Sequence, residues 1–316
     1  MYKFPLLAVV LTALLAVAVS PAAAHTRSTT VKLPAEFALP NDAVLGPDGA
    51  MWVTDSSLGR IWRIGSKQKK IRSYELGQQP TGITTGHGSM WVADAGGDAI
   101  HRVETDGSSV RYPLADGSFP TSIVKGPDGA LWFTEAHGDA IGRLALDGTV
   151  TEYPLPTADA FAGDIEVGPD GALWFSEAGG NNVGRITTGG QLTEYPVPGA
   201  DPLPGPIVAG ADGALYLGER NDNVISRFTT DGVFTDEYAL PRENADPLAM
   251  VAGRDGALLI SESSSGFVSR MTLDGRFTDK YRIRGGFNDG VALGRDTALW
   301  VLQGSLGQLT RLDLDR

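Results

Sequence analysis

Acidic side chains recur along the chain at intervals close to 40 residues, each directly after a short apolar run. Six of the seven positions are acidic and the last is glutamine: Asp55, Asp94, Glu135, Glu177, Glu219, Glu262 and Gln303. Grouped carboxylates can hold a metal ion or act as general acids and bases. They can equally be structural, because carboxylates cap backbone N–H groups and pair with arginine. Two interpretations stay open: structural partners within each repeat, or a carboxylate ring around one opening of a channel.

An arginine column of the same period favours the structural interpretation. Its members are Arg63, Arg102, Arg143, Arg185, Arg227, Arg270 and Arg311. If the acids are structural, we expect them to pair with these arginines or to cap neighbouring backbone N–H groups.

A further column, five residues before a recurring glycine turn, changes from repeat to repeat. Its members are Asn41, Thr81, Thr121, Gly163, Gly205, Leu248 and Asp289. A ligand does not share the symmetry of a repeat, so residues that break the pattern are the better site candidates. The predicted ligand-binding residues are Asn41, Asp42, Thr81, Thr121, Asp164 and Gln303, with Asp289 beside them. Asp164 and Glu166 alternate along one strand, so both can face one side.

Histidine is sparse, and His137 is the only one expected at this site. Its ordinary pKa suits a general base, although a loop position suits a solvated histidine equally well. The remaining candidates offer carboxylate, amide and carbonyl oxygens. Such a donor set favours Ca²⁺ or Mg²⁺ over zinc.

Composition excludes several classes of function. The chain has no cysteine, which rules out disulfides, thiolate catalysis and cysteine-ligated metals. Removing the leader residue Lys3 leaves 25 basic and 38 acidic residues, a formal charge of −13. That balance argues against nucleic acid as a partner. The sequence also lacks a Gly-x-Ser-x-Gly elbow, a His-x-x-x-His pair and a phosphate loop, so we expect no organic cofactor.

The N-terminus has the features of a secretory signal peptide over residues 1–24. Lys3 precedes an apolar stretch from Leu6 to Val19, and Ala22–Ala24 gives a small-residue cleavage pattern. No later stretch is long and apolar enough to span a bilayer. We therefore expect a secreted protein, with the periplasm or cell surface as alternatives.

The elements that position these residues follow from the repeat itself. Glycine turns of the Gly-x-Asp-Gly type start at Gly46, Gly86, Gly126, Gly168, Gly210, Gly253 and Gly294, and each precedes an apolar strand. In the third repeat, strands are expected over residues 121–124, 130–135, 141–144 and 150–154. A period near 40 with four short strands per repeat predicts an all-β, seven-bladed propeller.

The last repeat lacks a fourth strand, since the chain ends soon after Leu312. Residues 29–34 resemble that missing strand, so we expect them to pair with the C-terminal blade and close the ring. One domain then spans residues 25–316. Innermost strands line a central channel, the expected binding site for a small molecule or cyclic peptide. Nothing in the sequence indicates an oligomer, so we expect a monomer.

The repeated unit Gly-Pro-Asp-Gly-Ala-Leu-Trp-Phe, followed by Ile-Gly-Arg and Thr-Glu-Tyr-Pro, closely resembles the streptogramin B (virginiamycin B) lyases. The resemblance is clearest at residues 126–156 and 168–198. It implies a seven-bladed propeller that opens a cyclic depsipeptide by Mg²⁺-assisted elimination across an ester. It also implies a histidine base on late innermost strands and nearby glutamates that hold the metal.

This chain departs from that pattern at the expected base. Leu248 and Asp289 occupy the two histidine positions, and Gln303 replaces the last acid, whereas Glu262 matches an acidic position. The resemblance makes Asp289 or His137 the candidate base and Glu262 with Glu219 the candidate metal ligands.

Three functions stay open from the sequence. The first is a Mg²⁺-dependent carbon–oxygen lyase acting on an ester-containing small molecule or cyclic peptide. The second is a non-catalytic propeller that binds a ligand in the same funnel. The third is a calcium-dependent hydrolase of the lactonase type.

Overall fold

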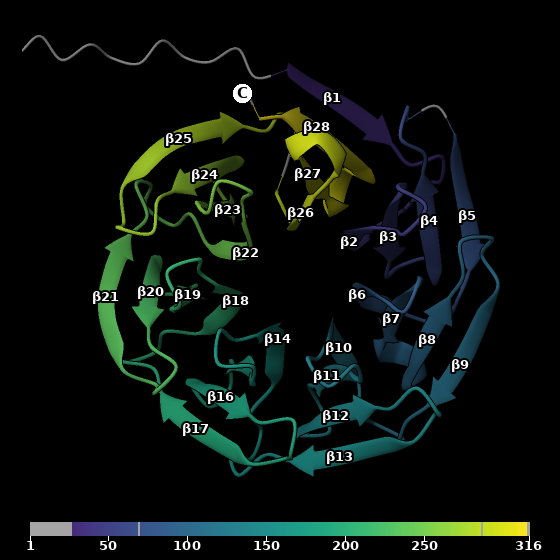
Figure 1. Cartoon of the computed structure of the whole chain (residues 1–316). Helices are drawn as coiled ribbons and strands as arrows, with labels where there is room; N and C mark the ends of the chain where they lie inside the picture. Colours follow the sequence, from purple (N-terminus) through teal and green to yellow (C-terminus); the bar gives the residue numbers. More distant parts are fainter. Residues whose placement is uncertain (1–26, 69, 286, 315–316) are drawn as a thin grey trace, which may run out of the picture.

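The computed structural model describes residues 27–68, 70–285 and 287–314. Its strands form seven four-stranded antiparallel sheets, arranged as the blades of a ring (Figure 1). This confirms the predicted all-β, seven-bladed propeller. The predicted signal peptide and His25 lie outside the described residues. Within those residues, no helix is long and apolar enough to cross a membrane.

The strands follow the same order in every blade, from the channel outward. The innermost strands are β2 (Pro40–Leu45), β6 (Pro80–Gly86), β10 (Pro120–Lys125), β14 (Ala162–Val167), β18 (Pro204–Ala209), β22 (Pro247–Ala252) and β26 (Gly290–Leu293). The second strands are β3 (Met51–Asp55), β7 (Ser89–Asp94), β11 (Leu131–Glu135), β15 (Leu173–Glu177), β19 (Leu215–Glu219), β23 (Leu258–Glu262) and β27 (Ala298–Gln303). The third strands are β4 (Arg60–Ile64), β8 (Ala99–Val103), β12 (Ala140–Leu144), β16 (Asn182–Ile186), β20 (Val224–Phe228), β24 (Phe267–Met271) and β28 (Gln308–Asp313).

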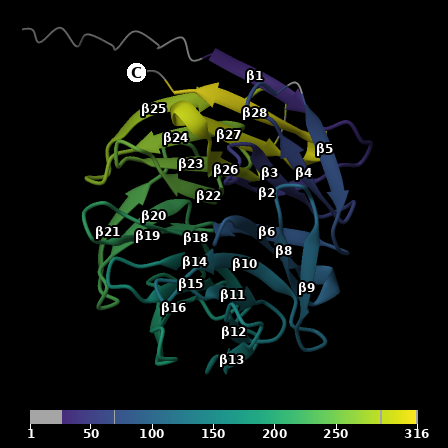
Figure 2. The ribbon, with the colours of Figure 1, turned by 45° about the vertical axis from the view of Figure 1, so that its right-hand side comes forward.

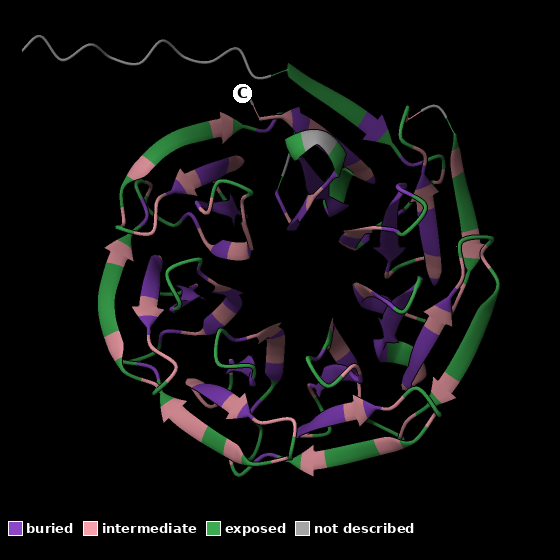
Figure 3. Cartoon of the chain, in the orientation of Figure 1, coloured by how far each residue is buried: buried purple, intermediate pink, exposed green. Residues whose placement is uncertain are grey.

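The outermost strands consist almost entirely of exposed and half-buried residues (Figure 3), and β1 adds the buried Val31. They are β5 (Ile71–Glu75), β9 (Ser109–Pro113), β13 (Val150–Pro154), β17 (Leu192–Pro196), β21 (Phe234–Ala239), β25 (Phe277–Arg282) and β1 (Arg27–Lys32). Three short 3₁₀ turns complete the described elements: η1 (Ala95–Gly97), η2 (Arg295–Thr297) and η3 (Gly304–Leu306).

The N-terminal strand closes the ring, as predicted. β1 pairs antiparallel with β28, and Thr29 stands opposite Arg311. Figures 1 and 2 show the purple first strand beside the yellow last one. The observed strand covers residues 27–32 rather than the predicted 29–34. Closure covers the outer edge of β28, which would otherwise be free to pair with another chain.

Second strands supply much of the core between blades, and a geometry that recurs at several glycine turns supports them. In blade three, Trp132 is fully buried and donates its indole N–H to Asp128 of the turn, 3.0 Å away. Arg143 of the third strand also bonds Asp128, at 2.7 Å. Tyr153 stacks on the same indole with ring centroids 5.6 Å apart.

Five of the seven column arginines therefore pair with turn aspartates, whereas Arg102 pairs with Glu104 and Arg311 with Asp313. The expectation that the arginines pair with the acidic column is wrong. The other pairs with turn aspartates are Arg63–Asp48, Arg185–Asp170, Arg227–Asp212 and Arg270–Asp255. The physical reason is strand register. Arg143 stands opposite Trp132 near the turn, whereas Glu135 stands opposite Ala140 at the other end of the blade.

Candidate functional site

A β-bulge near the start of the innermost strand gives the channel its polar lining. In blade one, Pro40 stands opposite Asp55 and Ala43 opposite Val53, so two residues of β2 share one partner on β3. The five following blades have a similar register shift. Bulges redirect side chains and often lie beside functional sites.

The innermost strands enclose a central cavity of about 1110 Å³. Four acidic residues line it: Asp42 from β2, Asp164 and Glu166 from β14, and Asp289 just before β26. Arg220 is the only basic residue of the described lining, and Asp246 already pairs with it at 2.7 Å. The cavity is therefore acidic, without a free cation of its own.

Asp42 plays the same structural role in blade one as Asp164 does in blade four. The Asp42 carboxylate accepts the N–H of Ala43 at 2.7 Å and that of Ile83, on the next blade, at 3.0 Å. Each aspartate thereby fastens its own innermost strand to that of the following blade.

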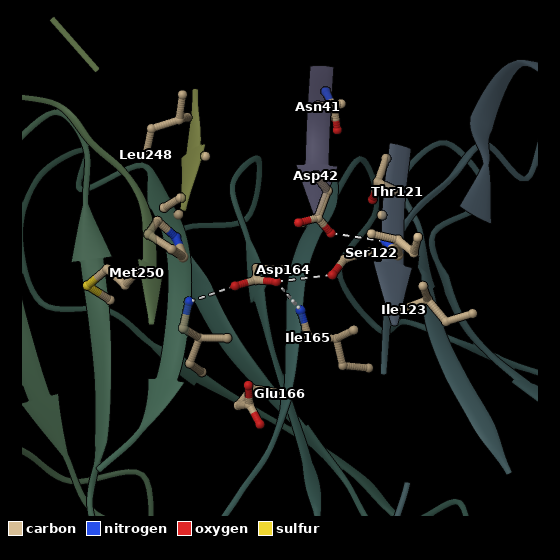
Figure 4. A pocket seen from close by; sticks show the side chains of 18 of the residues that line it. Asn41, Asp42, Thr121, Ser122, Ile123, Asp164, Ile165, Glu166, Leu248 and Met250 are labelled. Atoms are coloured by element: carbon tan, nitrogen blue, oxygen red, sulfur yellow. Dashed lines mark hydrogen bonds between the residues drawn. The ribbon is translucent and has the colours of Figure 1, made fainter. Parts of the chain in front are cut away.

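Asp164 accepts the N–H of Ile165 at 3.0 Å and that of Ile207, on the next blade, at 3.1 Å. The Ser122 hydroxyl adds a further bond at 3.0 Å. Figure 4 shows these bonds, with Asp42, Asp164 and Glu166 facing the same space. A carboxylate oxygen can accept more than one hydrogen bond, so both aspartates retain acceptor capacity toward the cavity.

The lining carboxyls hold their protons more tightly than ordinary acids do. Burial raises the pKa of Asp42 to about 6, and the nearby Asp164 charge adds to the effect. Burial also raises the pKa of Asp164. For Glu166, burial and then the Asp164 charge raise the pKa to about 7. A carboxyl with a pKa near neutrality is suited to proton transfer at physiological pH.

Five of the residues predicted from the sequence line this cavity: Asn41, Asp42, Thr121, Asp164 and Asp289. The Thr121 hydroxyl is engaged by the protein, because it bonds the Thr134 hydroxyl at 2.9 Å and the Ala162 carbonyl at 3.3 Å. Asp289 accepts the N–H of Gly304, and burial raises the pKa of Asp289.

Three other predicted residues lie elsewhere. Thr81 is buried and donates to the carbonyls of Ala93 and Pro120. Gln303 is fully buried in blade seven, where Thr310 bonds its side-chain oxygen at 2.8 Å. The exposed His137 stacks on the Phe119 ring, with centroids 4.2 Å apart. None of the three appears in the described cavity lining.

The two metal ligands suggested by the family resemblance are buried within their blades, away from the cavity lining. Arg242 approaches both oxygens of Glu262, at 2.7 and 2.6 Å, and stacks over the Phe267 ring at 3.8 Å. Ser265 donates to the same carboxylate at 2.6 Å. Glu219 accepts the hydroxyl of Ser226.

The Arg242 guanidinium thus already pairs with the Glu262 carboxylate. Among the described residues, no group of three or more histidine or acidic side chains that could hold a metal comes together. The residues present do not fit the magnesium site that the resemblance implies.

The acidic column as a whole lies inside the blades rather than around the channel. All seven members are at most 2% exposed, and none lines the described cavity. Asp55 accepts the indole N–H of Trp62 at 2.8 Å and the N–H of Leu39 at 3.0 Å. The Asp94 carboxylate caps the N–H of Gln79 at 2.7 Å. N–H capping is therefore found at these two positions.

Sequence reasoning overlooked two residues that shape these surroundings. Ser122 stands in the same column as Asp42 and Asp164, so alignment of the repeats one position further along would have revealed it. Arg242 lies in the loop before blade six and reaches Glu262 across 20 positions. No repeat signal marks Arg242, because the loops differ from blade to blade.

Comparison with known proteins places these features in context. The model of the virginiamycin B lyase family matches residues 8–205 and 164–316. A solved streptogramin B lyase structure is 30% identical, with a TM-score of 0.86 over 92% of this chain and 98% of that chain.

Virginiamycin B lyase from Staphylococcus aureus is also 30% identical, with a TM-score of 0.85 over 92% of this chain and 100% of that chain. A catalytically inactive histidine-to-alanine variant of that lyase, solved with quinupristin, gives the same values. A search of curated proteins found no match.

Proposed function

The chain belongs to the virginiamycin B lyase family. We propose that its central cavity binds a cationic small molecule or cyclic peptide. One observation carries the proposal. Asp42, Asp164 and Glu166 face a single cavity whose only described basic lining residue already pairs with Asp246.

Electrostatics explains why a cation is the preferred guest. Buried carboxylates are unfavourable without a partner of opposite charge, and burial has raised the pKa values here for that reason. A ligand cation favours the deprotonated form, so its binding releases protons from Asp42 and Glu166. The affinity should therefore rise as the pH increases from about 6 to above 7.

Elimination at an ester is a second candidate function, supported by family membership and by the pKa of Glu166. With that pKa near 7, Glu166 could take the proton from the carbon next to the carbon–oxygen bond. The C–H electrons would form a double bond and the carboxylate would leave, opening the ring without change of mass. No histidine lines the described cavity, so a carboxyl such as Glu166 or Asp289 would be the base.

Export is also part of the proposed function, supported by the charged, apolar and small-residue segments of residues 1–24. An exported binding propeller would meet its ligand outside the cytoplasm.

The test uses the mature chain with quinupristin, and with spermidine as a simple polycation. Calorimetry measures binding between pH 5.5 and 8, and mass spectrometry with chromatography follows the quinupristin, with and without EDTA. We expect affinity that rises with pH and falls in Asp164→Asn, while Glu75→Gln, whose side chain is 87% exposed, serves as the matched control.

The outcomes separate the candidates. Binding with unchanged quinupristin supports the binding propeller. A shifted retention time at unchanged mass supports the lyase, and addition of one water supports a hydrolase. If neither compound binds, or if binding is indifferent to Asp164→Asn, the cavity is not an acidic ligand site.

A further inference from the structure

We propose that paired glutamates on the second and outermost strands of blades three to five bind calcium ions. The pair Glu177 and Glu194 in blade four forms the most complete site, because Glu194 is half-buried whereas Glu152 and Glu237 are exposed. These pairs lie outside the central cavity, between the second and the outermost strands. The proposal does not depend on the function of that cavity.

The pairs have the same construction in three consecutive blades. A glutamate ends the second strand, a small residue follows on the third strand, and a glutamate on the outermost strand stands opposite that small residue. The three sets are Glu135, Gly142 and Glu152; Glu177, Gly184 and Glu194; and Glu219, Ser226 and Glu237. Their outermost strands, β13, β17 and β21, follow one another around the ring (Figure 1).

Each pair brings like charges together. The outer glutamate repels the inner one in all three blades. The further charges acting on the inner glutamates are also acids: Asp98 acts on Glu135, Asp139 on Glu177 and Asp222 on Glu219. Burial and these charges raise the pKa of each inner glutamate to about 7.

Two other blades carry a basic residue at the position of the outer glutamate. In blade two, Arg111 stands opposite His101, which bonds Asp94 at 3.4 Å. In blade six, Lys280 stands opposite Ser269, and Arg242 also neutralises the inner acid. The chain thus supplies positive charge in these two blades and a second negative charge in blades three to five.

Neutral residues occupy the corresponding positions in the two remaining blades. Ser73 stands opposite Trp62 in blade one, and Thr30 stands opposite Thr310 in blade seven. A second glutamate on the outermost strand is therefore found in three consecutive blades and not in every repeat.

A buried oxygen atom in two of the pairs has no partner within the described part of the chain. These atoms are Oε1 of Glu135 and Oε1 of Glu177. Both residues are at most 2% exposed. Buried polar atoms are nearly always bonded, so an unpartnered carboxylate oxygen beside a second carboxylate indicates a place for a cation.

Blade four offers the largest set of oxygen ligands. The Asn182 side-chain N–H group donates to Glu177 at 3.1 Å and to the Thr157 hydroxyl at 3.3 Å. The Thr157 hydroxyl in turn donates to Glu194 at 2.8 Å. Two carboxylates and one hydroxyl therefore gather their oxygen atoms at one place, and the Asn182 N–H group holds Glu177 and Thr157 together there. Glu194 is half-buried, so water can complete the coordination shell.

Calcium fits this set better than other common metals. It takes six to eight oxygen ligands in flexible geometry, whereas magnesium demands a near-ideal octahedron. Zinc and copper prefer nitrogen or sulfur donors, and the cluster contains none.

The test measures calcium alone against the full mature chain at pH 8. Metal-free protein is dialysed against calcium up to about 10 mM, roughly ten times the weakest dissociation constants of extracellular calcium modules. Bound metal is counted by mass spectrometry, and thermal unfolding is followed in parallel. We expect at least one bound ion per chain and a rise in Tm of about 3 °C.

Glu194→Lys copies the arrangement of blade six and is the decisive variant. We expect it to bind one ion fewer and to lose part of the calcium-dependent rise in Tm, with Glu194→Gln as the milder version. Glu75→Gln, on the outermost strand of blade one, should match the wild type. Absence of bound calcium in the wild type, or full binding by both Glu194 variants, would overturn the proposal.

Discussion

Replacing Glu177 by glutamine should stabilise the metal-free protein at alkaline pH, although it changes a fully buried carboxylate that accepts a hydrogen bond from Asn182. In the folded chain, burial raises the pKa of Glu177 from 4.5 to about 7. The unfolded chain gives up this proton near pH 4.5. Between these pH values the folded state binds more protons, so the free energy of unfolding falls as the pH rises.

The size of the effect follows from the two pKa values. One pKa unit corresponds to roughly 1.4 kcal/mol. The difference between 4.5 and about 7 therefore amounts to about 3 kcal/mol of lost stability at pH 8. Glutamine cannot ionise and should recover most of it. For a chain of this size the gain corresponds to a Tm increase of about 6 °C or more.

Urea and thermal unfolding in EDTA, at intervals from pH 5 to pH 8, would measure this. At pH 5 the wild type should already be about 1 kcal/mol less stable than Glu177→Gln, and the difference should widen to about 3 kcal/mol at pH 8. Glu75→Gln should stay within about 0.5 kcal/mol of the wild type throughout. EDTA matters, because bound calcium would hold Glu177 deprotonated and hide the difference.

One result would refute the reasoning directly. If Glu177→Gln is less stable than the wild type at every pH, the Glu177 carboxylate is a favourable structural partner rather than an unbalanced charge. A wild-type profile that does not fall above pH 5 would count against the other raised acids as well.

Three further predictions concern other parts of the ring. Arg242→Ala should lower the free energy of unfolding by about 3 kcal/mol, because the buried Glu262 loses its cation. Urea unfolding would show this, and adding Glu262→Gln should restore part of the loss. Asp164→Asn should weaken spermidine binding about tenfold by calorimetry, since charge-assisted hydrogen bonds contribute about 1.5–3 kcal/mol. Deleting residues 25–32 should leave the outer edge of β28 unpaired, because β1 then no longer covers it. We expect the Tm to fall by roughly 10 °C and the protein to aggregate, which light scattering would detect.

The acidic column shows how far sequence reasoning reached and where it stopped. Its period and its place at the end of the second strand could be read directly, and the strands end where expected at Glu135, Glu177 and Glu262. The direction in which its side chains point could not be predicted from the sequence. These acids point into the blade, where Trp62, Ser226 or Arg242 meets them.

The sequence by itself determined the propeller, the number of blades and the closure by the N-terminal strand. Glycine turns, alternating strands and a fixed period act locally, and each repeat can bury its apolar faces only against its neighbours. The tertiary structure alone decided which polar groups meet. A bulge changes the alternation of an innermost strand by one residue and turns Asp42 and Asp164 toward the next blade. Loops set the ion pair between Arg242 and Glu262, because contacts between distant segments depend on packing that no local pattern encodes.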